Sequence, residues 1–164
     1  VQSKRALVQR PPYGEDALER DFLDGFPFRD TQDQARAWQE IQQDLSKPSP
    51  MDRLLCGDVG FGKTEVALRT AFRVAVGGRQ VAVLAPTTIL AEQHARTFRR
   101  RCEPFGLEVE LLSRYRTPAQ RKEVHEKLAR GTVDIVVGTH QLLSKDVSFH
   151  DLGLVVIDEE QRFG

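Results

Sequence analysis

The sequence has few of the features that mark secreted proteins, membrane-spanning proteins or proteins with a structural metal site. It contains two cysteines, Cys56 and Cys102, which are far apart and lack the spacing of metal ligands, so we interpret them as reduced thiols of an intracellular protein. No run of residues approaches the roughly twenty apolar residues of a membrane span, and no export signal opens the chain. These absences predict a cytoplasmic protein with no membrane partner.

The chain also lacks net charge. Its 24 Lys and Arg residues balance 24 Asp and Glu residues, so the overall charge neither favours nor excludes nucleic acid. The candidates for contact with nucleic acid are instead two local basic clusters, Arg99 to Arg101 and the pair Arg114 and Arg116 around Tyr115. The alternative for either cluster is a solvated face or a helix end that the helix dipole favours. The length of 164 residues suits one domain with a substantial core.

One eight-residue segment, GDVGFGKT at residues 57–64, matches the phosphate-binding pattern G-x-x-x-x-G-K-[ST]. An apolar run at 53–56 precedes it and an amphipathic helical pattern follows it, which is the order strand, loop, helix. Glycines let successive amides point at a phosphate tail, and the helix start adds its partial positive charge. The alternative is a glycine-rich turn that happens to contain a lysine. We expect the nucleotide to contact Gly57, Asp58, Val59, Gly60, Phe61, Gly62, Lys63 and Thr64, with Lys63 at the β- and γ-phosphates and Thr64 on Mg²⁺.

A second acidic motif fits the same site. The run LVVI at 154–157 predicts a strand buried on both faces of a parallel sheet, and the sequence DEEQ follows it at 158–161. Carboxylates there emerge at the edge where open α/β sheets bind ligands. Asp158 is suited to holding Mg²⁺ and Glu159 to activating the attacking water. In isolation, an acidic loop after a core strand is the plain alternative.

Between these motifs, strands alternate with helices. We expect strands at 81–85, 108–112, 134–137 and 154–157, and helices at 88–101 and 118–130. Such alternation predicts an α/β fold with a parallel sheet flanked by helices. Before the phosphate loop we expect a short helical stretch at 15–23 and a helix from Thr31 with Ala35, Trp38, Ile41 and Leu45 on one face.

Read in order, these blocks resemble the first RecA-like domain of superfamily 2 helicases and translocases. They are GDVGFGKT at 57–64, APTT at 85–88 with LAEQH at 90–94, VGTH at 137–140, and DEEQ at 158–161. Within that group, three blocks look most like the transcription-repair coupling factor family, with the RecG family a close second: MDRLLCGDVGFGKTE at 51–65, GTH at 138–140 and DEEQRFG at 158–164. The resemblance covers residues 26–164. It implies a RecA-like P-loop NTPase domain, the first lobe of a two-lobe motor truncated after DEEQ, with 1–25 as a linker.

The resemblance also implies residue roles. Gln34 would read the adenine edge and Phe28 would pack near the base; the alternative is that Thr31 and Gln34 form a helix capping box. Gln161 would couple hydrolysis to DNA contact. The DNA-binding residues would be Pro86, Thr87, Thr88, Arg114, Arg116, Gly138 and Thr139, although threonine is also a common helix cap.

The implied activity is an ATP- and Mg²⁺-dependent translocase on double-stranded DNA that acts in transcription-coupled repair. RNA polymerase and excision-repair proteins would bind through modules outside these residues, and a second lobe would supply an arginine. The start at Val1 and the end at Gly164 suggest an excised fragment, which we expect to bind nucleotide weakly and to hydrolyse ATP negligibly. A RecG-like branched-DNA helicase, a small-molecule kinase or NTPase, and a non-catalytic module with a nucleotide cleft are the alternatives.

Overall fold

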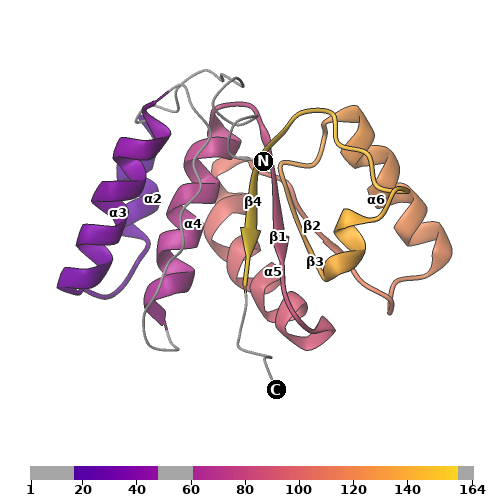
Figure 1. The fold of residues 1–164 in the computed structure, drawn as a ribbon, viewed down its shortest axis with the longest axis horizontal. Coiled ribbons are helices and arrows are strands. Elements are labelled where there is room, and N and C mark those ends of the chain that lie inside the picture. The colour runs from indigo at the N-terminus through magenta and orange to yellow at the C-terminus, as the bar shows by residue number, and fades with distance from the viewer. Residues whose placement is uncertain (1–16, 48–60, 159–164) are drawn as a thin grey trace, which may run out of the picture. The chain divides into compact units, whose positions relative to one another are not determined.

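A computed structural model of the chain describes residues 17–47 and 61–158 (Figure 1). The chain divides into two compact units, Val1–Arg73 and Val74–Gly164, and each is described by itself. None of the described helices combines the length and the apolar composition that a transmembrane segment needs.

The first unit is helical where it is described. Helix α2 covers Glu19–Asp24, α3 covers Gln32–Leu45, and α4, Phe61–Val76, begins in this unit. The predicted short helix at 15–23 is therefore observed from Glu19 onward. The stacked rings of Phe22 and Phe72, with centroids 4.0 Å apart, join α2 to α4.

Helix α3 begins with the capping box that the sequence offered as an alternative. The Thr31 hydroxyl accepts from the Gln34 amide at 3.1 Å, and Gln34 Oε1 accepts from the Thr31 amide at 2.7 Å. Trp38, Ile41 and Leu45 are buried as predicted. The prediction for Ala35 is wrong, because that residue is exposed and Gln34 occupies the buried face one residue earlier.

Two arginines of α4 organise the polar interior of this unit. Arg73 donates through Nε and Nη2 to the carboxylate of Glu19, and both side chains are buried. Arg69 donates to Asp30 at 2.7 and 2.8 Å and to Glu65 at 2.9 Å. Both guanidinium groups also lie near the Trp38 ring, at 5.1 Å for Arg73 and 6.0 Å for Arg69. Buried charges are tolerated here because they are paired and hydrogen-bonded.

The second unit contains a four-stranded parallel sheet, as the sequence predicted. The strands are β1 Gln80–Leu84, β2 Val109–Leu112, β3 Ile135–Gly138 and β4 Leu152–Ile157, in the order β2-β3-β1-β4. All three neighbouring pairs are parallel. Each predicted strand is found within two residues of its expected start, and β1 is buried along its whole length.

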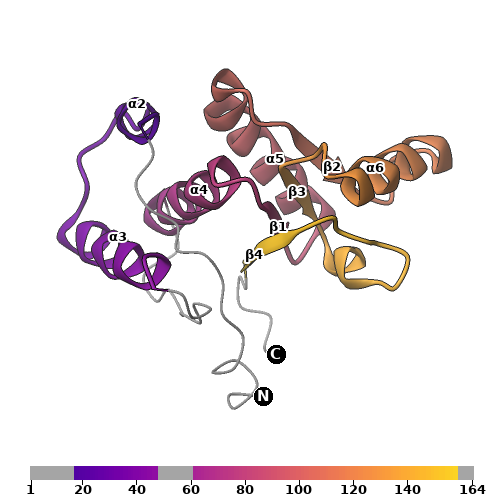
Figure 2. The same cartoon turned by 90° about the horizontal axis from the view of Figure 1, so that it is seen from above.

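Helices cover both faces of this sheet. Helix α5, Thr88–Cys102, and helix α6, Pro118–Arg130, lie on opposite sides of the strands (Figure 2). Short 3₁₀ helices η1, Glu103–Phe105, and η2, His140–Leu143, follow α5 and β3. The core on the α6 side joins helix, strand and η2 side chains: Ala82, Leu84, Leu112, Val124, Leu128, Val133, Val136 and Leu142.

Strand β4 departs from the prediction that it is buried on both faces. Val155 is 40% exposed and Ile157 is 59% exposed. The reason is position, because β4 is the last strand of the order and pairs with β1 alone among the described residues. An apolar run therefore identified the strand correctly but not its degree of burial.

A buried glutamine closes the amino end of the sheet. Gln80 Nε2 donates to the carbonyls of Leu128 and Val133 at 2.9 and 3.0 Å, and its Oε1 accepts from the Asp151 amide at 3.0 Å. One side chain thus ties together the end of α6, the approach to β3 and the approach to β4. Every hydrogen-bonding atom of the amide is directed at backbone, which explains why a polar group is stable there.

Candidate nucleotide and DNA sites

The phosphate-loop residues are described only in part. Gly57, Asp58, Val59, Gly60 and the expected strand at 53–56 lie outside the described residues. Phe61 and Gly62 open α4, and Lys63 and Thr64 follow in its first turn, each partly exposed. A lysine and a hydroxyl in the first turn of a 16-residue helix lie where the helix dipole favours anions. The contacts of these residues with a nucleotide stay predictions.

The residues expected to recognise adenine lie in the first unit. Phe28 is 64% exposed, whereas Gln34 is buried and its Oε1 is engaged in the capping box. The Gln34 amide nitrogen and a second lone pair on its oxygen remain as groups that a base could use. The adenine contact therefore stays a prediction with a reduced set of atoms.

Arg69 fixes the segment that carries these residues. Hydrogen bonds from Arg69 lower the pKa of the Asp30 carboxyl, although partial burial opposes the shift. Burial alone would lower the pKa of Arg69, but its hydrogen bonds to Asp30 and Glu65 together raise it. The guanidinium also lies 5.5 Å from the Phe26 ring centroid. The charged forms of these groups therefore stabilise each other and hold the chain before α3 against α4.

Asp158 follows β4 and is held by two hydrogen bonds. Its amide donates to the Leu84 carbonyl at 2.8 Å, and its Oδ2 lies 2.7 Å from Nε2 of His94 on α5. The carboxylate is partly exposed and remains able to accept from a further group. Glu159 and Gln161 lie outside the described residues, so their roles stay predictions.

The donor set suits Mg²⁺ bound together with a nucleotide. Within residues 17–47 and 61–158, no group of three or more His, Cys, Asp and Glu side chains could hold a metal by itself. Mg²⁺ commonly uses one or two protein oxygens plus phosphates and waters, so a hydroxyl such as Thr64 and a carboxylate such as Asp158 fit that chemistry. The approach of Thr64 and Lys63 to Asp158 stays a prediction.

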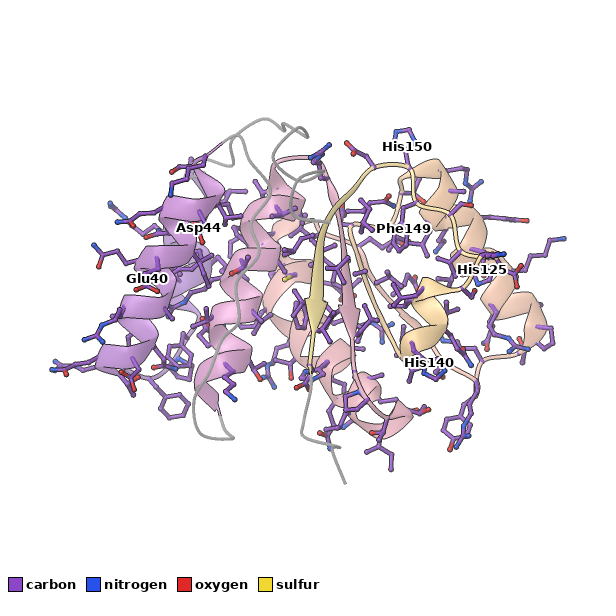
Figure 3. All side chains as sticks on the ribbon, in the orientation of Figure 1. Glu40, Asp44, His125, His140, Phe149 and His150 are labelled. Carbon is purple, nitrogen blue, oxygen red and sulfur yellow. The ribbon has the colours of Figure 1, made fainter. Side chains whose placement is uncertain are left out.

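The expected DNA-binding residues of the second unit lie along one edge of its sheet, which we call the carboxyl edge because β1 to β4 all end there. Leu84 pairs with Gly138 and with Ile157, and Leu112 also pairs with Gly138, so the four strands end level. The expected residues follow directly, with Pro86, Thr87 and Thr88 after β1, and Gly138 and Thr139 at the end of β3. Figure 3 shows His140 at this edge and His150 at the opposite end.

The threonines differ in their local roles. Thr87 caps α5, with its hydroxyl accepting from the Leu90 amide at 3.2 Å, whereas Thr88 is the first residue of the helix. Thr139 precedes η2 without a side-chain cap, and its carbonyl accepts from the Leu142 amide. A capping hydroxyl can still donate its proton, so capping and phosphate contact are compatible at Thr87.

The basic residues beside this edge are not equivalent. Arg114 is exposed and stacks near the Tyr115 ring at 5.2 Å, which leaves its charge available to a ligand. Arg116 lies 3.8 Å from Glu110 and is partly buried. In the other cluster, Arg99 donates to the Val109 carbonyl at 3.3 Å. The structure therefore favours Arg114 over Arg116 as an electrostatic contact, and it gives Arg99 a role in anchoring α5.

Gly138 has a steric role as well. A Cβ at this position would come 2.7 Å from the Leu112 carbonyl oxygen and 3.0 Å from the Leu142 side chain. A larger residue would push β2 and η2 apart, so glycine is required here whether or not DNA binds.

Two contacts were missed by sequence reasoning. The motif LAEQH at 90–94 contains His94 but predicts no partner for it, and no motif predicts the pair of Arg69 and Asp30. Glu65 and Arg69 stand four residues apart on one helix, which is a recognisable ion-pair spacing. The partners Asp158 and Asp30 are 64 and 39 residues away in the chain, and no local pattern indicates such distant pairs.

Comparison with known proteins bears on the family and the fold of the chain. The chain is 54% identical over 162 residues to the transcription-repair-coupling factor of Staphylococcus aureus (strain USA300), covering 98% of this chain and 14% of the relative. It is 55% identical over 147 residues to the protein of the same name from Bacillus subtilis (strain 168), covering 90% of this chain and 12% of the relative. The chain thus spans about one seventh of the length of these curated relatives. The predicted resemblance to the coupling factor is confirmed.

Solved structures give the same result for the fold. A structure of RecG bound to a three-way DNA junction superimposes with a TM-score of 0.88 at 40% identity, covering 99% of this chain and 22% of that one. A hypothetical ATP-dependent RNA helicase from Sulfolobus tokodaii, at 21% identity and a TM-score of 0.64, covers 88% of this chain and 41% of that one and supports the fold alone. The predicted RecA-like α/β fold is confirmed. Because the DEAD/DEAH box helicase family matches residues 31–164, the chain belongs to that family.

Proposed function

We propose that this chain is the ATP-binding lobe of an ATP-dependent translocase on double-stranded DNA that acts in transcription-coupled repair. One observation carries the proposal: four level parallel strands present hydroxyl and glycine residues and the acidic residue Asp158 along a single edge. In a helicase domain, the DNA contacts and the carboxylate that binds the metal must lie on connected elements, because ATP hydrolysis must change the affinity for DNA.

In this proposal, ATP and Mg²⁺ bind through the residues of the two nucleotide motifs. Gly57, Asp58, Val59, Gly60, Phe61, Gly62 and Lys63 cradle the phosphates, while Thr64 and Asp158 hold Mg²⁺ and Phe28 and Gln34 contact adenine. Bound Mg²⁺ would neutralise charge on the phosphates. Glu159 orients and deprotonates the attacking water, and Gln161 couples the γ-phosphate region to the DNA contacts.

DNA binds along the carboxyl edge without sequence preference. The hydroxyls of Thr87, Thr88 and Thr139 and the amides near Pro86 and Gly138 bond phosphate oxygens, and the exposed guanidinium of Arg114 adds attraction. Arg116 contributes less because Glu110 lies beside it. Contacts of this kind suit a motor that must step along any sequence.

Residues 26–164 form the lobe in this proposal, and residues 1–25 form an N-terminal extension whose helix α2 packs on α4. Catalysis also needs an arginine near the γ-phosphate, and such residues raise rates by about 10³ to 10⁵ where measured. We assign that arginine to a second RecA-like lobe, so the 164-residue chain by itself binds nucleotide weakly and hydrolyses ATP negligibly.

The names of the relatives point to the biological setting. The proteins called transcription-repair-coupling factor are bacterial, and similarity to them supports a cytoplasmic repair role for this chain. Displacement of stalled RNA polymerase and recruitment of excision-repair proteins would depend on modules outside these residues. The second candidate is a RecG-like helicase on branched DNA, which the 40% identity to the junction-bound RecG favours.

ATP hydrolysis by the complete polypeptide that contains this chain tests the proposal. We expect linear duplex DNA to stimulate hydrolysis strongly, single-stranded DNA to stimulate it weakly, and Lys63→Ala to abolish it. Stimulation by a three-way junction far above that by linear duplex would favour the RecG-like alternative. Hydrolysis that no DNA changes would refute both and favour a small-molecule NTPase.

A further inference from the structure

We propose that His94 is a positioning residue for Asp158, and that it sets the affinity of the site for the divalent cation bound with the nucleotide. This inference rests on the proposed function, because it concerns the same metal site. It adds a residue on α5 to the proposed metal ligands Thr64 and Asp158.

The contact between the two side chains concerns the tautomer of the imidazole. Nε2 of His94 and Oδ2 of Asp158 are 2.7 Å apart, and both side chains are partly exposed, at 17% and 27%. An ionised carboxylate only accepts hydrogen bonds, so Nε2 carries the proton and donates it. A hydrogen bond to an ionised acceptor at this distance is among the stronger ones in proteins.

The backbone that carries the His94 imidazole is held in place by the packing of helix α5. Ala91 and Ala95, on either side of His94 in sequence, are fully buried, and Thr87 caps the first turn. Arg99 donates to the Val109 carbonyl near the other end of the helix. These contacts restrain α5 against the sheet, so the donor of His94 has little freedom to follow a rotating carboxylate.

Within the part of the chain that the structure describes, no side chain other than His94 holds the Asp158 carboxylate. Its backbone is restrained by the hydrogen bond that the Asp158 amide donates to the Leu84 carbonyl, but that bond does not fix the carboxylate. With Oδ2 held by His94, the Oδ1 atom is left to serve the cation. A metal-binding carboxylate that is hydrogen-bonded in this way is pre-oriented, and loss of such a partner typically weakens metal affinity about 10- to 100-fold.

Binding of Mn²⁺, followed by its electron paramagnetic resonance signal in the presence of ADP, tests the inference in the complete polypeptide. We expect His94→Ala to weaken Mn²⁺ binding about tenfold or more. His94→Gln, which retains an amide donor, should recover most of that loss. The affinity for ADP without metal should change less than about twofold in both variants, because His94 is assigned no contact with the nucleotide. His125→Ala on α6 is the matched control and should match the unchanged protein (Figure 3).

Four outcomes would overturn the inference. Mn²⁺ binding by His94→Ala equal to that of the unchanged protein removes the role, and an equal loss in His94→Gln removes the hydrogen bond as its cause. A parallel loss of metal-free ADP binding indicates a structural effect. Failure of the unchanged protein to bind ADP would overturn the proposed function itself. If His94→Ala melts early, His94→Met fills the space without a donor and carries the same expectation.

Discussion

The buried pair of Glu19 and Arg73 gives the sharpest test of the packing described for the first unit. The side chains are 2% and 4% exposed, and two hydrogen bonds join them. Removal of one partner of a buried ion pair leaves an uncompensated charge and costs about 3–5 kcal/mol. We therefore expect Arg73→Met to lower the free energy of unfolding by about 3–5 kcal/mol, because it leaves the Glu19 carboxylate without its cation.

Substitution of the other partner, Glu19, should lower the free energy of unfolding by less. Without Glu19, Arg73 still lies 5.1 Å from the Trp38 ring, and the Gln42 amide oxygen, in the orientation that satisfies its neighbours, accepts from Arg73 at 3.1 Å. These contacts retain part of the stabilisation of the cation, so we expect a loss of about 1–3 kcal/mol for Glu19→Met. The double variant should recover to within about 1–2 kcal/mol of the starting protein, because two apolar side chains of similar volume replace the pair.

Urea unfolding followed by tryptophan fluorescence provides the measurement. Trp38 is the single tryptophan of the chain and lies beside the pair, so its emission reports on this unit rather than on an average. Arg36→Met on the exposed side of α3 serves as the control and should change stability by less than about 0.5 kcal/mol. A coupling energy below about 0.5 kcal/mol in the double-mutant cycle, or a larger loss for Glu19→Met than for Arg73→Met, would refute the reasoning.

Three further expectations concern other residues. Because Arg69 lowers the pKa of the Asp30 carboxyl, the ionised carboxylate stabilises the fold at neutral pH, and this stabilisation is lost as the pH falls below about 4. Asp30→Asn should therefore lower the free energy of unfolding at pH 7. In a series of urea melts, the variant should also lose less stability than the unchanged protein as the pH is lowered. Lys63→Ala should remove binding of a fluorescent ADP analogue while the circular dichroism melt is unchanged, and early melting would contradict a role confined to the site. Gly138→Ala should destabilise the chain by about 1–3 kcal/mol, because its Cβ meets the Leu112 carbonyl oxygen; an unchanged thermal melt would show that the strands separate freely.

Much of the second unit could be predicted because its signals are local. Helix α6 has the predicted bounds, since Thr117 caps it, Pro118 starts it and Gly131 ends it with a positive φ of 81°. The parallel sheet followed from strands alternating with helices, and pairwise register confirmed it. The level carboxyl edge is a consequence of parallel pairing, so the grouping of the candidate DNA residues was predictable as well.

Contacts between distant segments were not predictable in the same way. The burial of a strand depends on its place in the sheet, and the exposure of Val155 and Ile157 reflects the end position of β4. The same holds for His94, whose role depends on a carboxylate 64 residues away. On α3, the local capping box was recognised, but its consequence was not: Gln34 turns onto the buried face and Ala35 is left in solvent.

Gln80, at the start of β1, stabilises the sheet at the end opposite to the proposed ligand-binding residues. Gln80 takes part in three hydrogen bonds that lock the amino end, about 15 Å of chain away from the residues proposed to bind ligands. Exposed residues at the opposite end, unlike Gly138, can therefore be exchanged during evolution or engineering without loss of register. Insertions and fluorescent tags placed near Gln80, by contrast, would disrupt alignment and be read mistakenly as damage to activity.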